Sequence, residues 1–355
     1  MNAFEFTICT VADAGKTAVK RITPTETIPY AYVKWWRFEP AVETSLEGMA
    51  ERLRGLALQP KKMIVMGSPV AGLDLRQMHR RLSAAAQVDA GTATLCGPDR
   101  LWIPIDLDDV SVPFPFGRGS RLVEAATFVR DNLLPPEFHG VRMIAVPSAS
   151  TGRKGDTVAR LRLFAAFDRA HPLKSLKDWA KGAAATLDLP IDSSPVQAGH
   201  PTYTGRPVFE DVGDPVPHAL HATILAGNRD FVALEVDRFA PKLAAIEAKV
   251  DRVAHACGSN WRGLLNSMVG GDEGFCIPLT RGIGVAVRAG AAADEIHAVV
   301  ASLLAARADP GRRRQYGRSW VQQAIDSFRR RDDATRAATQ HAWSQLFGGG
   351  KAPWM

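Results

Sequence analysis

Cysteine is scarce in this sequence of 355 residues, which contains only four. They lie far apart, at Cys9, Cys96, Cys257 and Cys276, and no two of them form a CxxC pair. This spacing excludes a disulfide framework and a zinc site written in a local motif. Scattered, reduced thiols are typical of the cytoplasm, which is the location that we expect.

Long apolar runs are missing as well. No stretch is long enough to cross a bilayer, and the first residues lack the basic start and apolar middle of a signal peptide. We therefore expect no membrane partner. A Walker A motif is also missing, because segment 14–17 (AGKT) has Thr10 where the first glycine of a phosphate loop is required.

The overall composition is that of a globular protein, with 46% hydrophobic and 23% charged residues. The chain is long enough for two domains. Its net charge of +7 suits a nucleic-acid partner.

The pattern of the sequence changes along the chain. Strand-like and helix-like segments alternate irregularly over residues 1–210, which indicates a sheet domain of α+β or α/β type. Ala/Arg-rich segments with helical spacing dominate the later part, and these predicted helices span 241–257, 292–307, 317–331 and 333–346. We expect a sheet domain at 1–215, a connecting segment at 216–240, a helical domain at 241–347 and a flexible tail at 348–355.

An apolar strand that suddenly carries carboxylates spans residues 101–110 (LWIPIDLDDV). Side chains alternate along a strand, so Asp106 and Asp108 point the same way. Two carboxylates on one face repel each other, and a divalent cation such as Mg²⁺ or Mn²⁺ relieves that repulsion. The alternative is a strand that ends and turns polar, with solvated aspartates. Asp109 faces the other way, and we interpret it as the solvated end of the strand.

A two-metal site needs a third carboxylate. Asp192 follows a hydrophobic residue in a short predicted strand that can return beside the acidic strand. Asp168 lies six residues beyond Arg162, which is about 20 Å along an extended strand. Capping of the next helix is a sufficient explanation for Asp168. We prefer Asp192 as the third metal ligand and keep Asp168 as the alternative.

A small, hydroxylated loop follows the predicted strand at 141–146. Ser148, Ser150 and Thr151 in this loop can donate hydrogen bonds. The backbone near Gly152 can approach a phosphate closely. The sequence therefore predicts a nucleotide-binding loop, with an ordinary hairpin turn as the alternative.

Arginines are grouped at two further places. Arg160 and Arg162 are two residues apart on a predicted strand, so both project from one face and suit a triphosphate. A solvent-facing strand surface would explain them equally well. Basic clusters near the C-terminus could hold a single-stranded template, or could simply be solvated helix surface; they comprise Arg312, Arg313, Arg314, Arg329 and Arg330.

The order of these features resembles the catalytic core of archaeo-eukaryotic-type primases, in the plasmid- and phage-borne primase-polymerase branch. The first motif of that family, hhhDxD/E on a strand, is matched by residues 103–108 (IPIDLD). Its Ser-rich loop and the phosphate-binding strand that follows are matched by 147–152 (PSASTG) and 160–162 (RLR). Its third motif, a hydrophobic residue and an acid, is matched by residues 191–192 (ID).

The resemblance implies an α+β, RRM-like mixed-sheet core followed by an α-helical C-terminal domain. It implies transfer of nucleotides from NTP or dNTP, which makes primers on single-stranded DNA for plasmid or phage replication. Asp106, Asp108 and Asp192 would hold two Mg²⁺ or Mn²⁺ ions, while Arg160 and Arg162 would position the triphosphate. A replicative helicase would be a separate chain, because no Walker A motif is present.

One departure from the family is the missing histidine of the second motif, since no histidine lies between His139 and His171. It motivates the alternative of a non-catalytic replication initiator or DNA-binding module on a primase fold. A rolling-circle endonuclease or relaxase is a weaker alternative, because its metal-binding histidine pair is matched only by His218 and His221, in HALH. The candidate nucleophiles of such an enzyme are Tyr30, Tyr32, Tyr203 and Tyr316.

Overall fold

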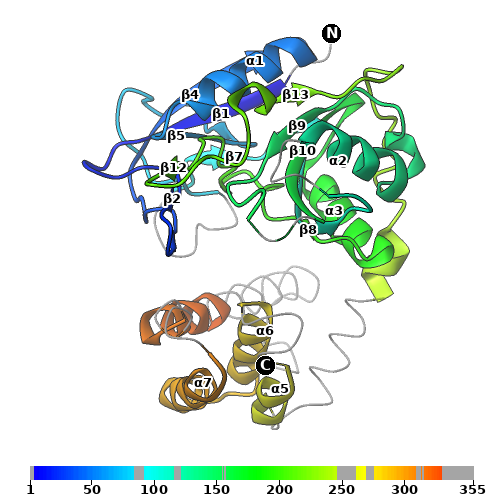
Figure 1. Ribbon diagram of the computed structural model, residues 1–355. Coiled ribbons are helices and arrows are strands. Elements are labelled where there is room, and N and C mark those ends of the chain that lie inside the picture. Colours follow the sequence, from blue (N-terminus) through cyan, green and yellow to red (C-terminus); the bar gives the residue numbers. More distant parts are fainter. Residues whose placement is uncertain are drawn as a thin grey trace, which may run out of the picture. The chain divides into compact units, whose positions relative to one another are not determined.

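The computed structural model divides into two parts, of which the first contains all the strands described and several helices, and the second contains helices (Figure 1). Residues 1–245 form one unit, the sheet unit, and residues 246–355 form the other, the helical unit. The structure describes residues 4–83, 92–115, 121–153, 155, 157–245, 261–268, 276–308, 313 and 316–329. The fold is mixed α+β, as the sequence predicts.

A three-stranded antiparallel sheet of order β4-β1-β5 begins the sheet unit. It consists of β1 (Phe4–Val11), β4 (Trp36–Glu43) and β5 (Lys62–Val65). Between β4 and β5, α1 (Leu46–Ala57) buries Met49, Leu53 and Leu56 at helical spacing. Ser45 caps this helix, because its side chain accepts a hydrogen bond from the Gly48 amide at 3.0 Å.

A second sheet, of order β11-β8-β10-β9-β13, carries the acidic strand. Its strands are β8 (Arg100–Ser111), β9 (Ile144–Pro147), β10 (Val158–His171), β11 (Ile191–Asp192) and β13 (Thr223–Ile224). Its four strand pairs are all antiparallel, so the sheet is not mixed as the sequence suggests. One of these pairs, β9 with β10, joins strands that follow each other directly along the chain, an arrangement that gives antiparallel neighbours.

The expected connecting segment at 216–240 contributes to this sheet. Its strand β13 pairs with β9, Thr223 opposite Ala145 and Ile224 opposite Ile144. Leu225 and Val232 from the same segment are buried in the main core. The sheet unit therefore extends through this segment, because it fills an edge of the sheet that the earlier strands leave open.

Short elements complete the sheet unit. The strands β2 (Arg21–Ile22), β3 (Thr27–Ile28) and β12 (Val208–Phe209) form one small sheet, and β6 (Ser68–Pro69) pairs with β7 (Leu95–Cys96). Further helical segments are α2 (Leu122–Phe128), η3 (Val129–Leu133), η4 (Pro136–Phe138), α3 (Leu173–Leu187) and η5 (His218–Leu220), and residues 240–245 are helical as well. Residues from α1, α2 and α3 share one buried core with both main sheets.

The start of β8 joins the two main sheets through two buried side chains. Arg100, only 1% exposed, donates from Nε to the Met66 carbonyl at 2.7 Å and from Nη2 to Ser68 Oγ at 2.8 Å. Trp102 donates from its indole nitrogen to the Glu5 carbonyl at 3.0 Å. A buried guanidinium is tolerated only when its donors are paired, so Arg100 fixes where β8 begins relative to the first sheet.

The helical unit contains α5 (Trp261–Met268), α6 (Cys276–Arg288), α7 (Ala293–Arg307) and a helical segment at 318–329. Apolar residues of these helices form a core of their own, which includes Leu265, Ile283, Val300 and Ile325. The predicted helix at 292–307 agrees with α7. The predicted helix at 333–346 and the tail at 348–355 lie outside the described residues, as does most of 241–257.

Replacing Arg100 by methionine tests the connection between the sheets. The Met66 carbonyl and the Ser68 hydroxyl lose their donors inside the protein, so we expect the free energy of unfolding to fall by about 2–4 kcal/mol. Urea denaturation measures this change. Arg21→Met is the matched control, because Arg21 pairs with Glu210 at the surface, and it should cost less than about 1 kcal/mol. An Arg100→Met protein as stable as wild type would contradict the proposed connection.

The buried ring of His221 makes stability depend on pH. Burial, together with the nearby Arg206 guanidinium, lowers the pKa of His221 to about 4. The unfolded chain therefore binds a proton below about pH 6.5 that the folded protein accepts only near pH 4. Stability should be constant above about pH 6.5 and fall by about 2 kcal/mol as the pH drops to about 4.5. His221→Phe should remove that part of the pH dependence in chemical denaturation curves. An unchanged curve would show that His221 is not its source.

Candidate active site

Three charged side chains stand in a row across β11, β8 and β10. The strand register places Asp192 opposite Asp106, and Arg162 opposite Asp106 on the other side. Directly opposite residues on antiparallel strands share a face and lie about 5 Å apart at Cβ. The pairing therefore brings two carboxylates and one guanidinium together from segments that are far apart in the sequence.

Arg162 forms an ion pair with Asp106, and both side chains are nearly buried, at 12% and 13% exposure. Arg162 Nη1 also donates to the Tyr203 carbonyl at 3.1 Å. Its Nε is buried and has no hydrogen-bond partner. The guanidinium thus has a donor left to offer, and its present partner Asp106 is one of the carboxylates predicted to hold metal.

Asp108 lies on the same face as Asp106, with Leu107 buried between them. Burial raises the pKa of Asp108, and the carboxylates of Asp106, Asp109 and Asp192 raise it further against the opposing effect of Arg160. Burial is the largest of these causes, and the neighbouring carboxylates add a smaller repulsion, which a bound cation would relieve.

Arg160 connects the acidic strand to the predicted nucleotide-binding loop. It donates to both carboxylate oxygens of Asp109, at 2.6 and 2.9 Å, and to Ser150 Oγ at 2.6 Å. Its Nη2 lies 3.6 Å from Asp108 Oδ1. Asp109 has a positive φ of 60°, next to a register shift in the β8–β10 pairing. This turn directs Asp109 to Arg160, a partner that the sequence analysis does not assign to it.

The predicted nucleotide-binding loop is held against β10 by its own hydrogen bonds. The Ser148 amide donates to the Arg160 carbonyl at 3.1 Å, and the Thr151 hydroxyl donates to that same carbonyl. Thr151 is buried, and Gly152 has a positive φ of 74°, which favours glycine. Thr151 therefore has a structural role here, whereas Ser150 is the hydroxyl that lies beside Arg160.

The two candidates for a third carboxylate are separated clearly. After α3 ends, Asp188 in left-handed conformation (φ 53°) turns the chain, and Pro190 accepts a hydrogen bond from the Asp108 amide at 3.1 Å. This return places Asp192 beside Asp106. Asp168 lies between Ala166, opposite Trp102, and His171, opposite Arg100, so it is at the other end of β8.

The donor chemistry of this site fits Mg²⁺ or Mn²⁺, which prefer carboxylate oxygens. Asp192 already accepts a hydrogen bond from the Ser194 amide at 2.8 Å, which orients its carboxylate. In the described part of the chain, however, no three His, Cys, Asp or Glu side chains are gathered as a ready metal-binding group. Asp106, the central carboxylate of the row, is paired with Arg162 instead.

The sequence analysis did not assign two aromatic and two basic residues to this row, although it named both tyrosines as candidate nucleophiles of an endonuclease. Tyr30 stacks on Tyr203, with ring centroids 3.6 Å apart and planes 7° apart. Burial raises the pKa of Tyr30. The Arg162 guanidinium lowers it, and the carboxylates of Asp106 and Asp108 raise it. His200 and Arg81 are the basic residues. The Arg81 guanidinium lowers the pKa of Tyr203, and His200 interacts electrostatically with Asp192. Tyr30 and Arg81 come from segments with no motif, so sequence reasoning could not bring them to the row.

The predicted template-binding arginines are in the helical unit. Arg312, Arg314 and Arg330 lie outside the described residues. Arg313 donates to the carbonyls of Ala308 at 2.8 Å and Ala305 at 2.9 Å, so it caps the end of α7. Arg329 is exposed on the helical segment.

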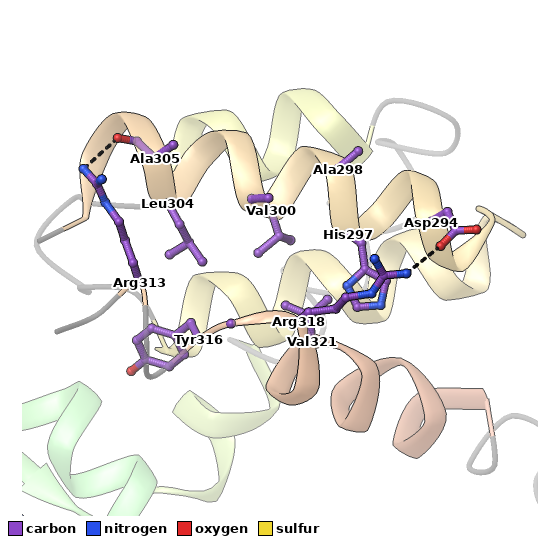
Figure 2. A pocket seen from close by; sticks show the side chains of 12 residues that line it. Asp294, His297, Ala298, Val300, Leu304, Ala305, Arg313, Tyr316, Arg318 and Val321 are labelled. Atoms are coloured by element: carbon purple, nitrogen blue, oxygen red, sulfur yellow. Dashed lines mark hydrogen bonds and ion pairs between the residues drawn. The ribbon is translucent and has the colours of Figure 1, made fainter. Parts of the chain in front are cut away.

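A cavity of about 490 Å³ lies beside α7, and Figure 2 shows Arg313, Tyr316, Arg318 and His297 around it. Arg318 pairs with Asp294 at 3.3 Å across one end of the cavity. The cavity is lined by residues of the helical unit and by none of the residues predicted to hold metal or to bind nucleotide.

Comparison with known proteins finds no sequence match and a weak structural similarity. No family model matches the sequence, and no curated protein matches it. The solved structure of primase RepB′ is similar over 95% of this chain and 96% of its own, with 9% sequence identity and a TM-score of 0.28. A TM-score of this size does not establish a common fold. Within the described residues, no helix is both long and apolar enough to cross a membrane.

Binding of Mn²⁺ to purified protein distinguishes Asp192 from Asp168. Asp192 lies beside Asp106, so Asp192→Asn should weaken Mn²⁺ binding by about tenfold or more. Asp168→Asn should leave the affinity within about twofold, because Asp168 is at the far end of β8. Titration followed by electron paramagnetic resonance measures the free ion. The opposite order of effects would make Asp168 the ligand.

Proposed function

We propose that the sheet unit is the catalytic core of a primase-type nucleotidyl transferase, of the RRM-like kind. In this proposal the protein makes primers from NTP or dNTP on single-stranded DNA during plasmid or phage replication. The observation that supports it is the row of Asp192, Asp106 and Arg162 across three neighbouring strands. Carboxylates beside guanidiniums are the two kinds of group that transfer of a nucleotide from a triphosphate requires.

The proposed roles follow from the side chains present. Asp106, Asp108 and Asp192 would hold Mg²⁺ or Mn²⁺, which when bound activates the attacking 3′-hydroxyl and offsets the charge of the leaving pyrophosphate. Arg160 and Arg162 would bind the triphosphate, with Ser150 orienting Arg160 through their 2.6 Å hydrogen bond.

Both arginines must change partners to do this. Arg160 is held by Asp109 and Arg162 by Asp106 in the free protein. A phosphate that binds these guanidiniums competes with the two carboxylates, so the affinity for nucleotide is lower than that of free arginines would be. Arginine also replaces the histidine that this loop-and-strand motif lacks, since it offers phosphate a bidentate donor.

The same ion pairs favour a second candidate function, a DNA-binding replication initiator without catalysis. Asp106 is occupied by Arg162, and a decayed site would retain such a pair because it balances two nearly buried charges. A primer-synthesis assay separates the two functions.

Primer synthesis on single-stranded DNA, with each metal and either nucleotide type, is the direct test. Wild-type protein should make dinucleotides and longer products. Asp106→Asn and Asp108→Asn should each lower the rate about a hundredfold or more, because they remove charge from the proposed metal site. Glu51→Gln, on the exposed side of α1, is the matched control and should not change the rate.

Two results would overturn the catalytic proposal. Unchanged synthesis by Asp106→Asn and Asp108→Asn would remove these carboxylates from the mechanism. Binding of single-stranded DNA by wild-type protein, with no dinucleotide formed under any of these conditions, would favour the initiator.

A further inference from the structure

Two segments of the sheet unit lie side by side at its surface and carry exposed aromatic and basic side chains. The Trp36 amide donates to the His79 carbonyl at 2.9 Å, and the His79 amide donates to the Trp36 carbonyl at 2.8 Å. This pair joins the segment before β4 to residues 76–80. We call the surface formed by Tyr32, Lys34, Trp35, Arg37, Arg76 and Met78 the aromatic strip.

Strand alternation explains why Trp35 and Arg37, which flank the first residue of β4, face outward. Trp36 and Phe38 point inward and are 3% and 4% exposed. Their neighbours Trp35 and Arg37 must then point away from the core. Trp35 is 39% exposed and Tyr32 is 80% exposed. The Tyr32 and Trp35 rings are therefore not held in place by burial in the core.

The second segment adds to the same surface. Met78 is 49% exposed, and the Arg76 side chain is 91% exposed although it pairs with Asp74. Exposed large apolar side chains that gather in neighbouring segments are typical of a binding surface, whereas single ones are ordinary.

The charges of the strip select the kind of partner. Lys34 Nζ lies 5.5 Å from the centroid of the Trp35 ring, and Arg37 is exposed two residues further along. Lys16 Nζ donates to the Tyr32 carbonyl at 2.7 Å and also pairs with Asp13 at 3.0 Å, so Lys34 and Arg37 are the cations of the strip that remain for a partner. Flat rings stack on bases and nearby cations contact phosphates, which is the combination that binds single-stranded nucleic acid.

The strip also leads to the candidate active site. Tyr30, two residues before Tyr32, stacks on Tyr203. The Tyr203 carbonyl accepts a hydrogen bond from Arg162, which pairs with Asp106. The segment that carries the exposed rings therefore also supplies Tyr30, whose stacking partner Tyr203 is joined through Arg162 to the carboxylate row.

We propose that the aromatic strip binds single-stranded DNA, with bases on Tyr32 and Trp35 and phosphates on Lys34 and Arg37, and directs it to the carboxylate row. The role of this DNA as template or primer rests on the proposed function. The binding itself does not, and it can be measured without any catalysis. The strip would then carry part of the binding that the sequence analysis assigned to the C-terminal arginines.

Fluorescence anisotropy of a labelled oligothymidylate, titrated with the full chain, tests this proposal. Tyr32→Ala and Trp35→Ala should each weaken binding by about fivefold or more, since one stacked base is lost. Trp35→Phe should keep most of the affinity, because a phenyl ring still stacks. Phe231→Ala is the matched control, since Phe231 is 43% exposed outside the strip, and it should change nothing.

Salt dependence supplies a second, independent measurement. Lys34→Gln and Arg37→Gln should each reduce the slope of log affinity against log salt by about one, because each removes one phosphate contact. Circular dichroism of every variant confirms that it is folded, which the exposure of these side chains leads us to expect.

Failure of the strip and failure of the proposed function give different results. The strip is rejected if wild-type protein does not bind the oligonucleotide, or if Tyr32→Ala and Trp35→Ala bind as wild type does. A Phe231→Ala protein weakened as much as the strip variants would also reject it. If binding depends on Tyr32 and Trp35 while wild-type protein makes no primer, the strip proposal is supported and the catalytic proposal is rejected.

Discussion

The register between β8 and β10 is the constraint on which the candidate site depends. It places Arg162 opposite Asp106, and it places Leu163 opposite Ile105 on the buried face. A shift of one residue would turn the charged pair into the core and expose the leucine. The buried apolar face of each strand therefore fixes the register of its charged face. Arg100 and Trp102 fix the start of β8 against the first sheet.

The charge balance of this site is uneven. The carboxylates of Asp106, Asp108, Asp109 and Asp192 act on one another beside the guanidiniums of Arg160 and Arg162. Arg81 and His200 add two basic groups beside them, and clusters of interacting charges of this kind are frequent at functional sites. The ion pairs reduce the repulsion in the free protein. A phosphate that binds the guanidiniums, or a cation that binds the carboxylates, must first break these ion pairs.

The aromatic strip and the carboxylate row belong to one unit. In the proposed arrangement one strand of DNA would contact both. Stacking on Tyr32 and Trp35 is tolerant of sequence, because every base has a flat face. Ion pairing with phosphate is tolerant in the same way. A primer-making enzyme that begins at many template positions needs this kind of binding, and so does a non-catalytic initiator that coats a single strand.

The sequence by itself determined what is local. A strand period of two places Asp106 with Asp108 and Arg160 with Arg162, and helical spacing predicts α7. Only the tertiary structure decided which segments meet. It brought Asp192 and not Asp168 to Asp106, placed Tyr30 against Tyr203, turned Asp109 toward Arg160 and gave the segment at 216–240 a strand in the sheet. The physical reason is that strand neighbours and chain returns depend on burying a common core, which no short stretch of sequence encodes.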